Sequence, residues 1–67
     1  MKNRIKILRA EKNLSQDELA KAISVSRQTI NAIENGKFNP SVKLAIKMAE
    51  LFGTSVENIF TLEEKDK

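Results

Sequence analysis

The sequence predicts a compact all-α chain of five short helices, and three observations support this expectation. Apolar residues recur at spacings of three and four, which is the period of an amphipathic helix. Serine stands directly before several of these stretches, where its side chain can cap the first turn of a helix. Pro40, Gly36 and Gly53 are the only residues of their kinds, and all three fall at expected helix boundaries. Residues 1–67 are therefore expected to form a single domain.

The first helix is expected over residues 4–12, with Asn3 as its cap, and the second over residues 15–23. Ser15 and Glu18 fit a capping box, in which the serine hydroxyl accepts from the Glu18 amide and the glutamate reaches back. Two residues, Ser15 and Glu18, therefore mark the start of the second helix.

The third helix is expected over residues 27–35, with Ser26 as its cap and Gly36 as the left-handed residue that ends it. The fourth follows the loop before Pro40 and runs from the Ser41 cap to about residue 52. Both carry broad apolar faces, as helices that pack on a core do.

The last part of the chain changes character twice. Residues 54–57 fit a second capping box and predict a short fifth helix through about Ile59. Residues 60–62 favour a β conformation and are expected to pair with residues 1–3, which adds a short terminal β-pairing to the all-α fold. Residues 61–67 are expected to form a charged tail.

Residues 16–35 form a unit in which two short helices are joined by the short turn Ser24-Val25. Ala20 is small enough to let the two helices cross closely, and Ile30 is placed to pack against it. The expected contact is made by Leu19, Ala20, Ile23, Val25, Ile30 and Ile33. This pattern predicts a helix-turn-helix motif, whose second helix enters the major groove of DNA.

The outward face of that second helix has the side chains that suit base edges. It consists of Ser26, Arg27, Gln28, Thr29, Asn31 and Ala32. Arginine can contact guanine, glutamine and asparagine can contact adenine, and small methyl groups can touch thymine. A face chosen only for solubility would favour glutamate and lysine, although an ordinary solvated surface remains the alternative.

Three stretches carry a family resemblance: residues 14–20, 25–37 and 39–41. Together they resemble the Xre/Cro-type helix-turn-helix family, which includes phage repressors, and the resemblance covers roughly residues 3–60. It implies a lambda-repressor-like DNA-binding domain that represses transcription as a homodimer on a palindromic operator. Ser24 departs from the glycine that the family often has in the turn, where the backbone is left-handed.

The resemblance also implies roles for individual residues. Base contacts are expected from Arg27, Gln28, Asn31, Ser26 and Ala32. Phosphate contacts are expected from Gln16, Thr29, Asn35, Lys37, Asn39, Ser41 and Lys43. Arg9 and Glu34 are expected to form an interior ion pair between the first and third helices. A dimer interface is expected from Leu51, Thr54, Val56, Ile59, Phe60 and Leu62, and the alternative is that Val56 and Phe60 complete the core of the monomer.

Composition narrows the remaining classes of site and function. The chain has no cysteine and no histidine, which excludes disulfides and the usual zinc sites, and no cofactor is expected. Without a histidine or cysteine, or a glycine-rich phosphate loop, an enzyme is not expected. No signal peptide or membrane-spanning segment is expected, and the absence of cysteine is compatible with the cytoplasm. Phe38, Phe52 and Phe60 are expected in the core.

The charge pattern leaves the partner open. The net charge is +3, with basic residues 1–12 and an acidic tail, which fits a polyanion on one side but equally fits ordinary solubility. The alternative function is a protein-interaction module, such as the antitoxin of a toxin–antitoxin pair, with residues 63–67 as the docking segment. RNA is disfavoured because the major groove of an A-form helix is too narrow for a recognition helix.

Overall fold

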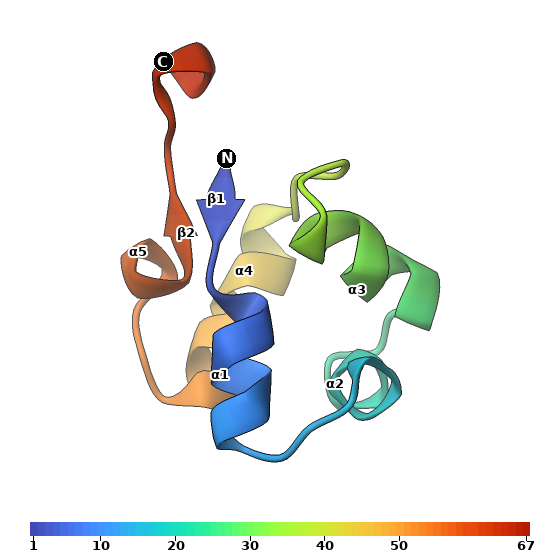
Figure 1. Ribbon diagram of the computed structural model, residues 1–67. Helices are drawn as coiled ribbons and strands as arrows, with labels where there is room; N and C mark the ends of the chain where they lie inside the picture. Colours follow the sequence, from blue (N-terminus) through green and yellow to red (C-terminus); the bar gives the residue numbers. More distant parts are fainter.

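The computed structural model describes residues 1–67 and contains five α-helices and one two-stranded sheet (Figure 1). The elements in chain order are β1 Lys2–Asn3, α1 Ile5–Glu11, α2 Gln16–Ala22, α3 Arg27–Glu34, α4 Val42–Phe52, α5 Val56–Ile59, β2 Phe60–Thr61 and the 3-10 turn η1 Glu64–Asp66. The five helices and the pairing of the chain ends agree with the expected fold. No helix has both the length and the apolar character needed to cross a membrane.

Serine caps begin four of the five helices. Ser15, Ser26, Ser41 and Ser55 each accept a hydrogen bond from the backbone amide three residues further on. At Ser15 the reciprocal half of the capping box is also present, because the Glu18 carboxylate accepts from the Ser15 amide at 2.9 Å. Each such cap stabilises its helix by about 1 kcal/mol relative to alanine.

The expected start of the first helix was wrong. Its cap is Arg4, which makes no side-chain capping bond, and Asn3 lies in β1 instead. The Asn3 side chain spans two elements: its Oδ1 accepts from the Ile5 amide at 3.2 Å, and its Nδ2 donates to the Ile33 carbonyl at 3.0 Å. Asn3 thus still accepts from an amide of the first turn of α1, but from a strand position one residue before the cap, while it also binds α3.

The expected capping box at the fifth helix does not form, and the cap lies one residue later than the expected Thr54. Ser55 is the cap, and its hydroxyl accepts from the Asn58 amide at 3.2 Å. Thr54 instead completes the end of α4, because its amide donates to the Ala49 carbonyl at 3.0 Å after the left-handed Gly53.

The core draws side chains from all five helices and from β2. Its largest fully buried members are Ile5, Leu19, Ile30, Ile33, Met48 and Ile59. Complete burial of an aliphatic side chain of this size contributes about 1.5–3 kcal/mol relative to exposure. Ile59 is 0% exposed and Phe60 is 9% exposed, so these two residues fill the core of the single chain and offer little surface to a dimer partner.

One expected core residue lies on the surface. Phe38 is 52% exposed, because it sits in the loop between α3 and α4 rather than on the apolar face of a helix. Phe52 and Phe60 are buried, as expected.

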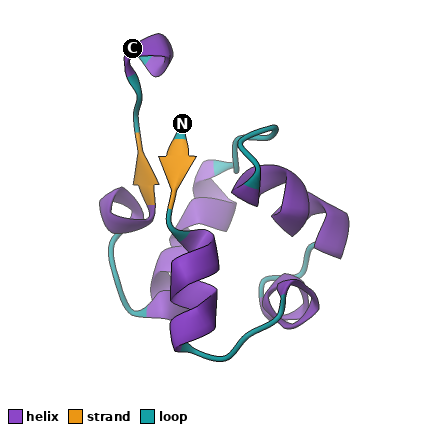
Figure 2. Cartoon of the chain, viewed as in Figure 1, coloured by secondary structure: helices purple, strands orange, loops and turns teal.

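The two chain ends meet beside α5 (Figure 2). Lys2 pairs with Thr61 and Asn3 with Phe60 in an antiparallel ladder. Beyond the ladder, the Met1 amino group contacts the carboxylates of Glu63 at 3.1 Å and Asp66 at 2.9 Å. This pairing of the acidic tail with the amino terminus was not among the expectations from the sequence.

Candidate nucleic-acid interface

α2, the turn and α3 form one unit on the side of the molecule opposite α5 (Figure 1). Ala20 is 1% exposed at the crossing of the two helices, and the Val25 amide donates to its carbonyl at 2.9 Å. Ser24 has φ of 61°, so it adopts the left-handed conformation expected at this turn. The short turn holds α3 at a fixed angle to α2, with Ile30 and Ile33 buried beneath it.

The outward face of α3 is accessible and carries a single charge, that of Arg27. Arg27, Gln28 and Asn31 are exposed, whereas Ala32 is half-buried. Thr29 is also half-buried, and its hydroxyl lies 3.0 Å from the hydroxyl of Ser26, which caps the helix. The side chains at positions 27, 28 and 31 therefore remain available to a ligand, while Ser26 and Thr29 are partly committed to the helix start.

A nearly buried ion pair joins α1 to α3. Arg9 Nε lies 2.6 Å from Glu34 Oε2, and Arg9 Nη2 lies 3.2 Å from Glu34 Oε1. A third donor of the guanidinium, Nη1, donates to the Leu14 carbonyl at 2.8 Å. The side chains of Arg9 and Glu34 are 13% and 7% exposed, so the pair has the interior position that the resemblance implied.

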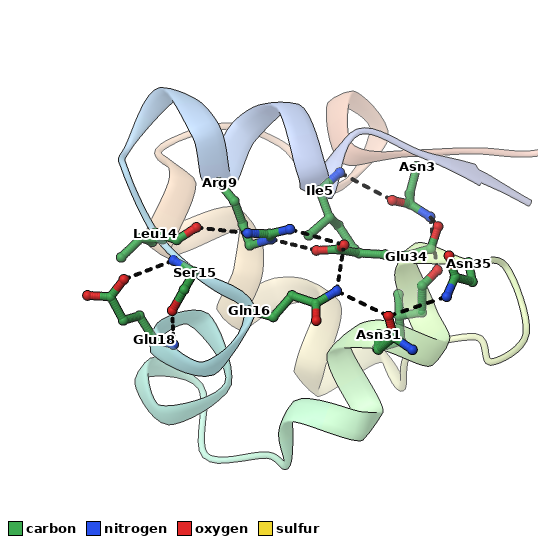
Figure 3. Close-up of polar contacts among 11 residues, drawn as sticks. Asn3, Ile5, Arg9, Leu14, Ser15, Gln16, Glu18, Asn31, Glu34 and Asn35 are labelled. Carbon is green, nitrogen blue, oxygen red and sulfur yellow. Dashed lines mark hydrogen bonds and ion pairs between the residues drawn. The ribbon is translucent and has the colours of Figure 1, made fainter.

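Hydrogen bonds continue from this ion pair to the outward face of α3 (Figure 3). Gln16 Nε2, from the start of α2, donates to Glu34 Oε1 at 3.1 Å and to Asn31 Oδ1 at 3.2 Å. Asn35 Nδ2 donates to the same Asn31 oxygen at 3.3 Å. Gln16, expected at a phosphate, therefore already donates its amide hydrogens within the protein.

Basic and polar residues lie near both ends of α3. Lys37 and Asn39 are exposed in the loop after its C-terminus, close in sequence to Asn35. Ser41 and Lys43, from the start of α4, line a shallow hollow together with Ser24, in the turn before α3. Five of the seven expected phosphate-contacting residues thus fall into two groups, one near each end of α3, and Gln16 and Thr29 lie outside both groups.

Lys47 and Phe38 were not among the expected contacts, although both lie next to the motif. Lys47 lines the hollow beside the turn, one helical turn after Lys43. Phe38 lines a second shallow hollow with Gln28 and Ala32 on the outward face of α3. The usable signal for Phe38 was its position between Lys37 and Asn39 in a polar loop, where no helical periodicity supports burial.

Comparison with known proteins places the same unit in a family. Residues 5–59 match the family model HTH_3, described as helix-turn-helix. A relative named an uncharacterized HTH-type transcriptional regulator, from Methanocaldococcus jannaschii, is 54% identical over 66 residues, which is 98% of this chain and 100% of the relative.

Two solved structures share the fold. The restriction-modification controller protein C.AhdI from Aeromonas hydrophila is 30% identical with a TM-score of 0.76, over 85% of this chain and 86% of that one. A chain of the SinR–SinI protein complex is 35% identical with a TM-score of 0.76, over 92% of this chain and 59% of that one. Because the family match spans most of the sequence and includes α2, the turn and α3, this chain belongs to the helix-turn-helix family of transcriptional regulators, which are DNA-binding proteins and not enzymes.

Proposed function

We propose that this chain represses transcription by binding a palindromic operator in duplex DNA as a homodimer. The observation that carries the proposal is the outward face of α3, which is accessible and polar but bears only the charge of Arg27. The hydrogen bonds of Gln16 and Glu34 hold this face in place from behind. A rigid helix that displays donors, acceptors and a methyl group suits the major groove, where each base pair presents its own pattern.

In this proposal Arg27 and Gln28 make the main base contacts. An arginine fits the O6 and N7 acceptors of guanine, and a glutamine fits the N6 donor and N7 acceptor of adenine. Ala32 supplies a methyl group for a thymine methyl, and Ser26 and Asn31 add polar contacts beside them. A good two-bond contact of this kind discriminates against the wrong base by about 1–3 kcal/mol.

The two groups of residues at the ends of α3 contact phosphates on either side of the groove. Lys37, Asn35 and Asn39 serve one end, Ser41 and Lys43 serve the other, and Thr29 and Gln16 lie between them. Gln16 reaches a phosphate only by sharing or exchanging a bond that it now makes to Asn31 or Glu34. Each phosphate neutralised by a cation contributes about −0.9 to the log–log slope of affinity against salt.

Two arguments support a dimer: the short stretch of DNA that one recognition helix can contact, and an exposed apolar surface on the protein. Twofold dimers of this motif bind half-sites about 34 Å apart, so that two recognition helices enter successive major grooves. Val42 is 77% exposed and Ile46 is 47% exposed, and both line an apolar groove with Val56 and Phe60. We place the dimer interface on this groove, with Leu51 and Thr54 as further candidates from the sequence, whereas Leu62 lies beyond β2 and does not line the groove. A dimer bound at a promoter excludes RNA polymerase by occupancy alone.

The test is selection from a library of random-sequence DNA duplexes, at two salt concentrations, with the wild type and with Arg27→Ala and Gln28→Ala. The expected result is a palindromic motif that each variant weakens at one position per half-site, with an unchanged helical circular dichroism spectrum. If no sequence is enriched, or if both variants select the same motif as the wild type, the assignment of α3 as the reading helix is wrong.

A second candidate function is protein binding at the same apolar groove, as in an antitoxin. It is favoured by the likeness to a chain of the SinR–SinI complex, which joins two different proteins. Sedimentation of the purified chain separates the two candidates. A dimer that persists at the concentrations used for DNA binding supports self-association, and a monomer that retains a co-purified partner supports the second candidate.

A further inference from the structure

The hydrogen bonds behind α3 have a fixed polarity that begins at Arg9. A guanidinium has only donors, so both oxygens of Glu34 accept from it. Glu34 Oε1 must then meet another donor wherever it makes a further contact. The group of Gln16 that faces it is therefore the amide nitrogen and not the amide oxygen, at 3.1 Å.

The same nitrogen of Gln16 fixes the orientation of Asn31. Gln16 Nε2 lies 3.2 Å from the nearest polar atom of the Asn31 side chain. This atom must be the Asn31 oxygen, because two NH2 groups that face each other are both donors and would repel. Reversing the Asn31 amide would require reversing Gln16 as well, and would then set the Gln16 oxygen against the Glu34 carboxylate. The orientation that is usually ambiguous for a surface asparagine is thus determined, through Gln16 of α2, by the ion pair between Arg9 of α1 and Glu34 of α3.

Both acceptor positions of the Asn31 oxygen are occupied. It accepts from Gln16 Nε2 at 3.2 Å and from Asn35 Nδ2 at 3.3 Å, and a carbonyl oxygen has two lone pairs. The Asn31 Nδ2 group donates to no group of the protein, and the residue is exposed on the outward face of α3. Asn31 therefore presents two hydrogen-bond donors and no free acceptor.

We propose that Asn31 is a donor-only reader that favours guanine over adenine in its base pair, an inference that rests on the proposed function of binding duplex DNA. Adenine recognition by asparagine needs the side-chain oxygen to accept from N6 while the nitrogen donates to N7. Guanine instead offers two neighbouring acceptors, O6 and N7, which match a pair of donors. Gln16 is the positioning residue, because it occupies the oxygen that adenine would require.

The first arm of the test examines the hydrogen bonds in the free protein. Gln16 and Gln28 are the only glutamines in the chain, and their side-chain amide protons can be compared by NMR. Those of Gln16 are expected to exchange with water at least about fivefold more slowly, and Asn31→Ala is expected to reduce the difference. Equal exchange rates for the two glutamines would overturn the proposal without any use of DNA.

The second arm selects sites from a random-sequence duplex library with the wild type, Asn31→Ala and Gln16→Leu. The wild type is expected to enrich guanine at the position that Asn31→Ala makes indifferent. Leucine has a similar length but donates nothing, so Gln16→Leu frees one lone pair of Asn31 and is expected to shift that position toward adenine by about fivefold. A role for Gln16 at a phosphate alone would lower affinity for every sequence equally and shift no position.

Two controls separate the possible outcomes. Gln28→Leu, the same substitution at the other glutamine, should alter its own position in the motif and leave that of Asn31 unchanged. Gln16→Leu combined with Asn31→Ala should shift nothing at that position. Adenine there with the wild type, or no shift with Gln16→Leu, overturns the proposal while the DNA-binding function stands. If no motif is enriched at all, the function fails and the guanine preference fails with it, whatever the exchange rates show.

Discussion

Glu34 links three helices, because it lies on α3 and accepts hydrogen bonds from Arg9 of α1 and Gln16 of α2. Glu34→Ala leaves the Arg9 guanidinium, only 13% exposed, without a counter-charge. Loss of one partner of such a pair is expected to lower the free energy of unfolding by about 3–5 kcal/mol, as measured by urea denaturation. Replacing both partners, with Arg9→Met and Glu34→Leu, should cost much less. Equal losses in the single and double variants would show that the ion pair does not act as a unit.

Phe38 is expected to matter for DNA binding but not for the stability of the fold. The ring is 52% exposed and borders the hollow beside Gln28 and Ala32. Phe38→Ala is expected to change the free energy of unfolding by no more than about 0.5 kcal/mol, as for most surface substitutions. It should nevertheless weaken DNA binding severalfold in a fluorescence anisotropy titration, because the ring lies beside the reading helix.

Leu62→Ala is a matched control for Phe38→Ala. Leu62 is 59% exposed but belongs to the tail beyond β2 and does not line the hollow beside Gln28 and Ala32. It should leave the DNA affinity of the folded dimer nearly unchanged. If Phe38→Ala binds as tightly as the wild type, Phe38 is only a solvent-exposed loop residue.

Individual site residues were predictable to the extent that their side chains act alone. Arg27 and Gln28 could be assigned from their places on the outward face of a helix, and the structure leaves both exposed. Gln16 and Asn31 could not be assigned fully, because their orientation depends on contacts between α2 and α3 that join residues far apart in the sequence. Phe38 was placed wrongly because an aromatic residue was taken as core without a helical period to support it.

At the scale of the element, the sequence predicted helix starts well where a serine interacts only with its own helix. The caps at Ser15, Ser26 and Ser41 fall where they were expected. The two failures, at Asn3 and Thr54, occur where the side chain or backbone is used by a neighbouring element. Local capping patterns are therefore reliable within a helix and lose their value at a junction between elements.

The attachment of the tail is expected to depend on pH, because two of its carboxylates contact the Met1 amino group. Hydrogen bonds from the amine to Asp66 and then Glu63 raise the pKa of the amino group above its ordinary value of 8.0. The hydrogen bond from the amine, followed by that from the Glu63 amide, lowers the pKa of Asp66 below its ordinary value of 3.8.

These two shifts define the pH range over which the tail stays attached. The amine contributes fully below pH 8.0, and its contribution is lost as the pH rises through the raised pKa. Asp66 contributes fully above pH 3.8, and its contribution is lost as the pH falls through the lowered pKa. Backbone NMR shifts of η1 should therefore stay constant across neutral pH and move at both extremes. Asp66→Asn should weaken the response at both extremes, and an unchanged titration would show that this contact does not hold the tail.

Across the whole molecule, the polar outward face of α3 is distinct from the apolar groove that residues of α4 and α5 line. The groove contains Val42 and Ile46, which are far more exposed than Ile59 and Phe60, two of the six residues that the sequence had assigned to the interface. Sequence alone could not make this distinction, because apolar residues at helical spacing look the same whether they face a core or a partner. Only the packing of α5 and β2 against the core shows which of them remain exposed.

The separation leads to a prediction in which dimerisation and DNA binding are linked. Ile46→Asp places a charge in the groove but, at 47% exposure, does not disturb the buried core, so the helical spectrum should be unchanged. The variant is expected to sediment as a monomer. Because a monomer engages one half-site, it neutralises about half as many phosphates, and the log–log slope of affinity against salt should also fall to about half.

Ile7→Asp is the matched control, since Ile7 has a similar exposure of 53% and lies on α1 rather than among the residues that line the groove. It should retain both the dimer and the full salt slope. If Ile46→Asp loses affinity but keeps the slope of the wild type, the number of phosphates engaged has not changed, and the groove cannot be the surface that joins two half-sites. If instead the slope is halved in Ile46→Asp alone, the groove sets the number of recognition helices on the DNA, while the residues of α3 decide which sequence each helix accepts.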